Sequence, residues 1–293
     1  MLSTEGPMEG RMADIKNPAR ARLSEGAVSI GVGLRLARGV EIARIMRSCG
    51  WDWLFIDLEH GAMSLDTCSQ ISVAALDAGI APIIRVPQGQ LDMATRALDG
   101  GGWGIVMPHV DTAEEAAAIV ERVKYPLEGH RSVMGALPHF GYRGLGVGEA
   151  AKIVNAEMLV TVMIETPRAL ENAEKIAAVP GVDVLLIGTN DLAMEMGIPG
   201  QFAHEKIFGA YERVIAACRK HGKWPGMGGC YVDDLLRRYI AMGMRMILGG
   251  NDLPFLMAGA SERAKHLRAC RTAQEPMLRA WAPGPASPRS PPR

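Results

Sequence analysis

The sequence has few cysteines, no net charge and no long apolar run, and each shortage argues against a class of protein. The five cysteines among 293 residues are odd in number and form no C-x-x-C pair, which argues against a disulfide framework or a zinc knuckle. Such usage is typical of reduced thiols in a cytoplasmic protein. With 32 basic and 32 acidic side chains and no basic cluster, the chain lacks the electrostatic signature of a nucleic-acid-binding protein.

The sequence also shows no pattern typical of a membrane span or a signal peptide. No run approaches the roughly 18 uncharged apolar residues of a membrane span. The N-terminal stretch, which contains Glu5 and Glu9, has no apolar signal-peptide segment. We therefore expect a cytoplasmic protein whose partners are small molecules, with no membrane and no nucleic acid among them.

A unit of amphipathic helix, glycine and apolar run repeats along the chain. Glycine ends the expected helices at Gly50, Gly79, Gly222 and Gly243, where a left-handed C-cap favours it. The eight apolar runs lie at about residues 27–34, 53–57, 82–86, 103–107, 159–164, 183–187, 224–228 and 244–248. They predict an α/β fold, a single-domain (β/α)8 TIM barrel over residues 16–272, with an open doubly wound sheet as the alternative.

Three segments fall outside this repeat. Residues 1–15 are polar and without pattern, and we expect them to be flexible; the proline-rich residues 273–293 are expected to be disordered. The connection over residues 125–156 is long and rich in glycine, and loops of this length are often functional. It carries three candidates for contacts with an anionic substrate: Arg131, His139 and Arg143.

Two local patterns bear on the helices and the first strand. Gly31-Val-Gly33 has no third glycine three residues later, so small residues inside a packed sheet explain it better than a dinucleotide motif. Asp111, followed three residues later by Glu114, predicts the N-cap and capping box of a helix that ends at Val123.

Polar side chains stand at the ends of four predicted strands. These are Asp57, Glu59 and His60 after the second strand, Arg85 at the end of the third, Glu165 after the fifth and Asp191 after the sixth. Because the carboxyl ends of barrel strands converge on one face, we expect these groups to lie close together. That face is the predicted active site.

Glu165 and Asp191 form the most informative pair. Two carboxylates on neighbouring strand ends repel one another and need a cation, a proton or an arginine between them. An oxygen ligand set of this kind suits Mg²⁺ or Mn²⁺. Two alternatives stay open, a buried ion pair between Glu165 and Arg85, and an N-cap role for Asp191 in the helix after the sixth strand.

The other strand-end residues allow more than one role. His60 suits a general base, because histidine titrates near neutral pH, although a structural histidine fits the spacing equally well. Asp57 and Glu59 alternate in direction, so at most one of them is expected to face the pocket. Arg85 is suited to pairing with a protein carboxylate or to gripping one on a substrate. His109, after the fourth strand, is a weaker candidate.

Four motifs, in order and with compatible spacing, resemble the class II pyruvate-type aldolases. This is the family of 4-hydroxy-2-oxoheptanedioate aldolase and 2-dehydro-3-deoxyglucarate aldolase, distantly related to the citrate lyase beta subunit. The likeness runs from about residue 27 to 268 and rests on FIDLEHG, IIRVP, VMIETPRALEN and LLIGTNDLAMEMG.

The resemblance implies an aldehyde-lyase that depends on a divalent metal, Mg²⁺ or Mn²⁺ with Co²⁺ as a further option. Such an enzyme reversibly cleaves a 4-hydroxy-2-oxo acid to pyruvate and an aldehyde through a metal-stabilised enolate. An oxaloacetate-type decarboxylase, or an enzyme that joins carbon to a pyruvate enolate, is the alternative. A non-catalytic barrel with a binding role is a more distant one.

The resemblance also implies a role for individual residues. Five of them match functional positions of the family: Glu165 and Asp191 as metal ligands, His60 as the catalytic base, Arg85 as the group that holds the oxo acid and stabilises the enolate, and Asp99 as an aspartate that tunes the histidine of a neighbouring subunit. A homo-oligomer is implied, a hexamer built as a trimer of dimers.

Some features of the sequence depart from the family or extend it. Met163 stands where the relatives carry glutamine, and Asn190 stands where they carry alanine. Asn190, Asp191 and Arg85 are expected to contact the substrate, so these departures leave the acceptor open. The family implies that the helix over residues 252–270 is exchanged between subunits.

Overall fold

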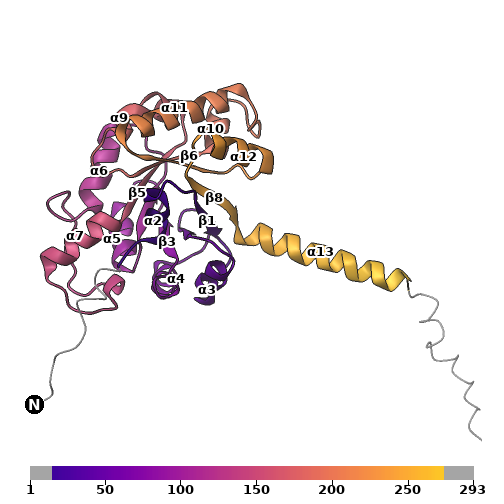
Figure 1. Ribbon diagram of the computed structural model, residues 1–293, viewed down its shortest axis with the longest axis horizontal. Coiled ribbons are helices and arrows are strands. Elements are labelled where there is room, and N and C mark those ends of the chain that lie inside the picture. Colours follow the sequence, from indigo (N-terminus) through magenta and orange to yellow (C-terminus); the bar gives the residue numbers. More distant parts are fainter. Residues whose placement is uncertain (1–14, 274–293) are drawn as a thin grey trace, which may run out of the picture. The chain divides into compact units, whose positions relative to one another are not determined.

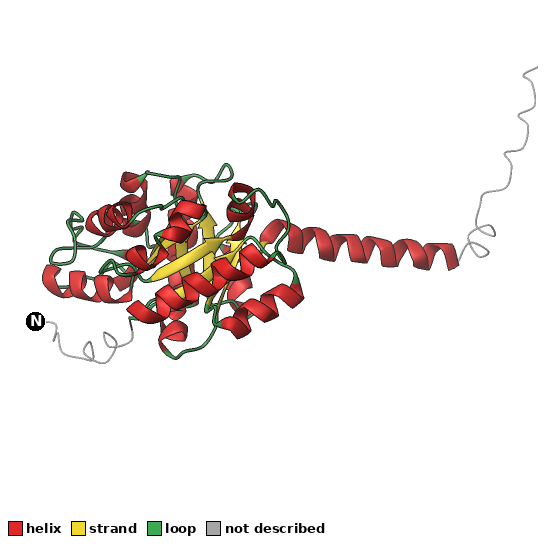
Figure 2. Ribbon diagram, turned by 90° about the horizontal axis from the view of Figure 1, so that it is seen from above, coloured by secondary structure: helices red, strands yellow, loops and turns green. Residues whose placement is uncertain are grey.

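A closed barrel of eight parallel strands, surrounded by helices, forms the body of the protein in a computed structural model that describes residues 15–273 (Figures 1 and 2). Each strand pairs with the next, and β1 pairs with β8 to close the ring. The predicted (β/α)8 barrel is confirmed, and the open sheet is wrong. The strands are β1 (Ser29–Leu34), β2 (Trp53–Asp57), β3 (Ala81–Arg85), β4 (Gly104–Met107), β5 (Leu159–Ile164), β6 (Val184–Gly188), β7 (Trp224–Gly228) and β8 (Met246–Asn251).

One helix, α2 (Pro18–Ser24), precedes β1, and the other helices of the barrel connect consecutive strands. They are α3 (Glu41–Ser48), α4 (Leu65–Ala78), α5 (Leu91–Asp99), α6 (Ala113–Val123), α7 (Val147–Glu157), α8 (Pro167–Glu171), α9 (Ala173–Ala177), α10 (Thr189–Glu195), α11 (Glu205–His221) and α12 (Asp233–Met242), with a short 3-10 helix at Pro138–Phe140. The segments expected to be flexible or disordered lie outside the described residues, apart from Ile15 and Ala273 at their borders.

Two predictions about helices need correction. The capping box of α6 is built by Thr112, whose hydroxyl accepts from the backbone N–H of Glu115, and not by Asp111 with Glu114. The side chain of Glu115 accepts in return from the backbone N–H of Thr112, so the helix begins one residue later than expected. The connection between β4 and β5 contains α7, which the glycine-rich sequence concealed.

The period of two along each strand decides what faces the barrel interior. In β2, Trp53 and Phe55 pack inside the barrel, while Leu54 and Ile56 face the helices. Continuing that alternation places Asp57 on the inner side at the carboxyl end. The same rule brings Arg85, at the end of β3, beside Asp57, with which it lies in register. The apolar interior therefore ends in a charged layer.

The chain divides into two compact units after Asp252. The first contains the barrel, and the second begins at Leu253 and contains most of α13 (Asp252–Ala273). Large apolar side chains of α13 are exposed in the single chain: Leu253, Phe255, Leu256, Met257 and Leu267. In the part of the chain that the structure describes, no helix combines the length and the apolar character needed to span a bilayer.

Candidate active site

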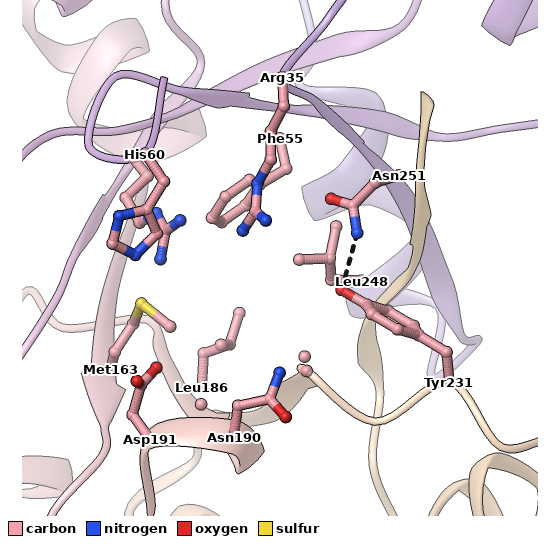
Figure 3. A pocket seen from close by; sticks show the side chains of 14 residues that line it. Arg35, Phe55, His60, Met163, Leu186, Asn190, Asp191, Tyr231, Leu248 and Asn251 are labelled. Carbon is pink, nitrogen blue, oxygen red and sulfur yellow. Dashed lines mark hydrogen bonds between the residues drawn. The ribbon is translucent and has the colours of Figure 1, made fainter. Parts of the chain in front are cut away.

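A cavity of ≈ 240 Å³ lies where the strands end at their carboxyl termini. Four residues predicted for the site line it, His60, Arg85, Asn190 and Asp191, together with Met163 (Figure 3). They come from the ends of β2, β3, β5 and β6, which are far apart in the sequence. Barrel closure brings them together, as the strand-end rule predicts.

Asp57 is the anchor of the charged layer. It is completely buried, and its carboxylate accepts from the Nε and Nη2 of Arg85 at 3.0 and 2.5 Å and from the Nε of Arg35 at 3.0 Å. The backbone N–H groups of Glu59 and His60 also donate to it. Burial alone raises the pKa of Asp57, but the hydrogen bonds and positive charges outweigh it and hold the pKa below its ordinary value.

Three side chains contact the guanidinium of Arg85. Besides Asp57, its Nη1 lies 3.2 Å from the Oε2 of Glu59, and its guanidinium stacks over the ring of Phe55 at 5.0 Å. Both carboxylates after β2 therefore contact Arg85, and neither lines the cavity. His60 is different, since its side chain is 59% exposed and its Nε2 lies 3.8 Å from the Oε2 of Glu59. The imidazole of His60 is therefore accessible to a ligand in the cavity.

Glu165, directly after β5, is a buried carboxylate with few compensating groups. Its Oε2 accepts from the backbone N–H of His109 at 2.8 Å and lies 3.5 Å from that histidine's Nδ1. Burial raises its pKa to about 7, and the nearby charge of Asp191 adds to the increase, while His109 and Arg85 act in the opposite direction. The alternative of a Glu165–Arg85 ion pair is not observed, because Arg85 pairs with Asp57 and Glu59.

Two backbone features lie beside Glu165. A Cβ atom on Gly188 would lie 2.5 Å from the Oε1 of Glu165, so only glycine leaves space for the carboxylate there. His109 adopts a φ of 51°, a left-handed conformation that costs energy for a residue with a side chain. His109, a weak candidate in the sequence, contacts Glu165 through its backbone N–H but does not line this cavity.

Asp191 lies in the first turn of α10 and makes no side-chain cap, so the N-cap alternative is wrong. Its side chain lines the cavity near Met163 and Asn190 (Figure 3). Across residues 15–273, no three His, Cys, Asp or Glu side chains are arranged to hold a metal ion. Within those residues, Glu165 and Asp191 are two carboxylates whose charges interact, since the charge of Asp191 raises the pKa of Glu165.

Asp99 and the polar residues of the 125–156 connection lie away from this cavity. Arg131 is buried and donates from Nη2 to the Oδ1 of Asp99 at 2.6 Å, while stacking over the ring of Tyr125. His139 is buried and its Nε2 lies 2.9 Å from the carbonyl oxygen of Gly102. Arg131 and His139 therefore stabilise the connection, and neither lines the cavity of the same chain.

Three polar cavity residues were not predicted from the sequence. Arg35 follows β1, Tyr231 follows β7, and Asn251 ends β8. Each could have been found by applying the strand-end rule to these strands. Arg35 was passed over because its stretch was considered only for a dinucleotide motif, and Asn251 because the eighth strand is three residues longer at its end than the apolar run.

Comparison with known proteins identifies relatives over most of the chain. The chain is 38% identical over 257 residues to "4-hydroxy-4-methyl-2-oxoglutarate aldolase tasA" of Hapsidospora irregularis, covering 86% of this chain and 95% of the relative. It is 32% identical over 237 residues to "5-keto-4-deoxy-D-glucarate aldolase" of Klebsiella pneumoniae, covering 81% and 91%. The crystal structure of an HpcH/HpaI aldolase from Desulfitobacterium hafniense superposes with a TM-score of 0.78 at 29% identity, covering 90% of this chain and 97% of the other.

The family description "HpcH/HpaI aldolase/citrate lyase" matches residues 37–254. That range contains every predicted site residue and most of the barrel. It agrees with the family that the four sequence motifs predicted, and the aldolase-named relatives indicate a lyase. The chain therefore belongs to the HpcH/HpaI aldolase/citrate lyase family.

Proposed function

We propose that the protein is a divalent-metal-dependent aldolase that cleaves a 4-hydroxy-2-oxo acid to pyruvate and a second carbonyl compound. The observation that carries the proposal is an interacting pair of carboxylates, Glu165 and Asp191. Asp191 lines a cavity together with His60 and Arg85, and the buried Glu165, which is not among the lining residues, has its pKa raised in part by the charge of Asp191. Membership of an aldolase family supports the same chemistry.

The two carboxylates fit a divalent cation. Glu165 is 1% exposed, and its pKa is raised to about 7 by burial and by the charge of Asp191. Such a pair lacks positive charge, and no arginine or lysine ion pair within residues 15–273 supplies it to either group. Mg²⁺ and Mn²⁺ commonly bind one or two carboxylates and leave the other positions to water and substrate. When bound, the cation supplies a Lewis acid that stabilises negative charge on the keto oxygen.

Residues of the chain itself bind the substrate and transfer the proton in this proposal. Arg85, fixed by Asp57 and Glu59, presents a preorganised positive charge to the oxo acid. His60, the exposed titratable group at the cavity, accepts the proton of the 4-hydroxyl group as the carbon–carbon bond breaks. Asn190 and Asp191 contact the substrate from the opposite wall. Asp99 acts through a neighbouring subunit in this proposal, since it does not line the cavity of its own chain.

A homo-oligomer, specifically a hexamer in which α13 is exchanged between subunits, is part of the proposal. The exposed apolar side chains of α13 support it, because a large apolar surface is costly to leave in water. Light scattering of the full chain tests the hexamer. A cytoplasmic location and the choice between Mg²⁺, Mn²⁺ and Co²⁺ also remain predictions.

A retro-aldol screen of 4-hydroxy-2-oxo acids with these three cations, following pyruvate release, tests the function. His60→Ala is expected to lower the rate by roughly 10²–10⁴-fold if His60 transfers the proton. His130→Ala is the matched control, because His130 is an exposed histidine outside the cavity. Cleavage by His60→Ala at the wild-type rate would remove the assignment of the base. Release of carbon dioxide from oxaloacetate, without any retro-aldol activity, would favour the decarboxylase instead.

A further inference from the structure

The first turn of α10 carries two residues of the proposed site. Asn190 and Asp191 are neighbours in this turn and both line the cavity, and Figure 3 shows their side chains directed into it. The helix has only 7 residues, and no side chain caps its N-terminus at Gly188. Because a helix this short is marginal by itself in water, contacts outside the helix must fix the direction in which Asn190 and Asp191 point.

Three side chains of α10 are buried, and only one of them is polar. Leu192 and Ala193 pack in the apolar core, whereas Thr189 is completely buried although it carries a hydroxyl group. That hydroxyl donates to the carbonyl oxygen of Gly228 at 2.6 Å. Gly228 ends β7 and lies in register with Gly188, so the bond joins the start of the helix to the neighbouring strand. Apolar packing is not directional, but this hydrogen bond is, and it fixes the rotation of the turn.

Tyr211, on α11, completes the hydrogen bonds of Thr189. Its hydroxyl lies 2.8 Å from the Oγ1 of Thr189, and because the single hydroxyl proton of Thr189 goes to Gly228, the tyrosine is the donor. Burial raises the pKa of Tyr211 above its ordinary value, so the phenol keeps its proton at neutral pH. Its ring stacks on that of Tyr239 with the centroids 3.7 Å apart, and the hydroxyl of Tyr239 donates to the carbonyl oxygen of Phe202 at 2.7 Å. The donor to Thr189 is therefore itself fixed by α12.

The backbone after β7 approaches the same turn closely. Gly229 lines the cavity and has a φ of 82°, in the left-handed region that favours glycine. A Cβ atom at this position would lie 3.1 Å from the backbone nitrogen of Asn190 and 3.3 Å from that of Thr189. Both distances are shorter than an ordinary van der Waals contact, so the two segments have little room to shift against each other. The first turn of α10 and the end of β7 therefore pack as one unit.

We infer that Thr189, supported by Tyr211, is a positioning residue that holds the first turn of α10 in the orientation from which Asp191 binds the cation. Thr189 contacts neither the cation nor the substrate in this scheme and acts only through the orientation of the turn. The inference rests on the proposed function, because that proposal makes Asp191 a metal ligand. The alternative is a buried threonine that contributes to stability alone, and the two roles differ in their effect on cation affinity.

Binding of Mn²⁺ to the full chain, followed by electron paramagnetic resonance, separates these roles. Thr189→Val keeps the shape of the side chain but removes the hydroxyl group, and the dissociation constant for Mn²⁺ should rise roughly 10-fold. Thr189→Ser retains the hydroxyl group and should return the constant close to its wild-type value. Thr161→Val is the matched control and should leave the constant unchanged, because Thr161 is a completely buried threonine of β5 whose hydroxyl has no hydrogen-bond partner within the described residues.

The two stacked tyrosines provide a second comparison. Tyr211→Phe and Tyr239→Phe each remove one hydroxyl hydrogen bond of a buried tyrosine and keep the ring. Both should lower the free energy of unfolding in urea, but only Tyr211→Phe should weaken Mn²⁺ binding. Its effect should be smaller than that of Thr189→Val, because the bond from Thr189 to Gly228 remains. Equal Mn²⁺ affinities of the two tyrosine variants, wild-type affinity in Thr189→Val, or failure of serine to restore the affinity would overturn the inference.

Hydrogen exchange distinguishes a failure of this inference from a failure of the proposed function. In the metal-free chain, amide exchange followed by mass spectrometry should be faster over α10 in Thr189→Val and unchanged there in Thr161→Val. If the wild type binds no Mn²⁺, the proposed cation site fails, whereas faster exchange in Thr189→Val would still show that Thr189 holds the turn. Unchanged exchange over α10 in Thr189→Val would overturn the inference even if the wild type binds Mn²⁺.

Discussion

Asp57 and Glu165 are two buried carboxylates in the same charged layer, and their surroundings are opposite. Asp57 is met by Arg85, Arg35 and two backbone N–H groups, and its pKa is lowered. Glu165 receives one backbone N–H and the edge of a histidine, and its pKa rises to about 7. Equal burial therefore produces opposite effects, because the number of partners differs.

The difference is the one expected between a structural acid, Asp57, and the metal ligand that Glu165 is proposed to be. A carboxylate whose partners are all protein groups fixes its neighbours, as Asp57 fixes both arginines. A carboxylate left short of positive charge retains affinity for a proton or a cation. Glu165 has this second character, and Gly188 leaves the space that it needs.

The largest expected effect comes from removing the charge of Glu165. Glu165→Gln keeps the shape of the side chain but removes a proposed metal ligand, so affinity for Mn²⁺ should fall by more than about 100-fold and retro-aldol turnover should be abolished. Mn²⁺ binding followed by electron paramagnetic resonance measures the first effect without any substrate. Glu115→Gln, at the exposed cap of α6, is the control. Wild-type Mn²⁺ affinity in Glu165→Gln would contradict the ligand assignment.

Removing the charge of Asp57 should instead destabilise the fold. Asp57→Asn leaves two guanidinium groups without their shared partner, and breaking a buried ion pair typically costs about 3–5 kcal/mol. The free energy of unfolding, measured by urea denaturation, reports this cost. Asp92→Asn, which breaks the exposed pair with Arg122, should leave it nearly unchanged. Similar results for the two variants would remove Asp57 from its anchoring role.

The smallest effect is a difference in pH dependence. The ordinary pKa of Glu165 is 4.5 and its folded value is about 7, so its contribution to stability is present below pH 4.5 and is lost as pH rises through 7. Relative to Glu165→Gln, the metal-free wild type should lose on the order of 3 kcal/mol of unfolding free energy between pH 4.5 and 8. Urea denaturation with a chelator at these two pH values measures the loss.

Asp57 should not contribute to the pH dependence that this experiment measures. Asp57 has a lowered pKa, so its contribution is present above its ordinary value of 3.8 and is lost only as pH falls below it. Between pH 4.5 and 8 that contribution stays constant. Saturating Mg²⁺ at pH 8 should restore the stability lost through Glu165. A wild type that tracks Glu165→Gln at both pH values would show that Glu165 is already compensated within the protein.

The barrel could be predicted because its strands are short apolar runs separated by helix signals. All eight strands lie within three residues of their expected bounds. Three of the cavity's polar residues, His60, Arg85 and Asp191, followed from one rule, that strands of a barrel end on a common face. The strand-end rule says which side chains converge, and this geometry does not depend on their individual conformations.

The missing parts depended on contacts that sequence spacing does not encode. Alternation allowed at most one of Asp57 and Glu59 to face the pocket, and neither lines the cavity. Their shared partner, Arg85, did not follow from the spacing. Arg131 and His139 were candidates for contacts with an anion, but both are buried. Arg131 donates to Asp99 and stacks over Tyr125, and the Nε2 of His139 lies within hydrogen-bond distance of the carbonyl oxygen of Gly102. A side chain's partners come from other strands, and sequence alone does not show which of them reach it.

The absence of a side chain at Gly188 affects the position of the Glu165 carboxylate. A single methyl group at this position would fall on the carboxylate oxygen of Glu165. Alanine there would force the Glu165 carboxylate to move, although every charged residue of the site would remain in the sequence. If the two acids bind a cation as proposed, a chain that keeps both of them but has lost this glycine would carry the motif around a displaced carboxylate.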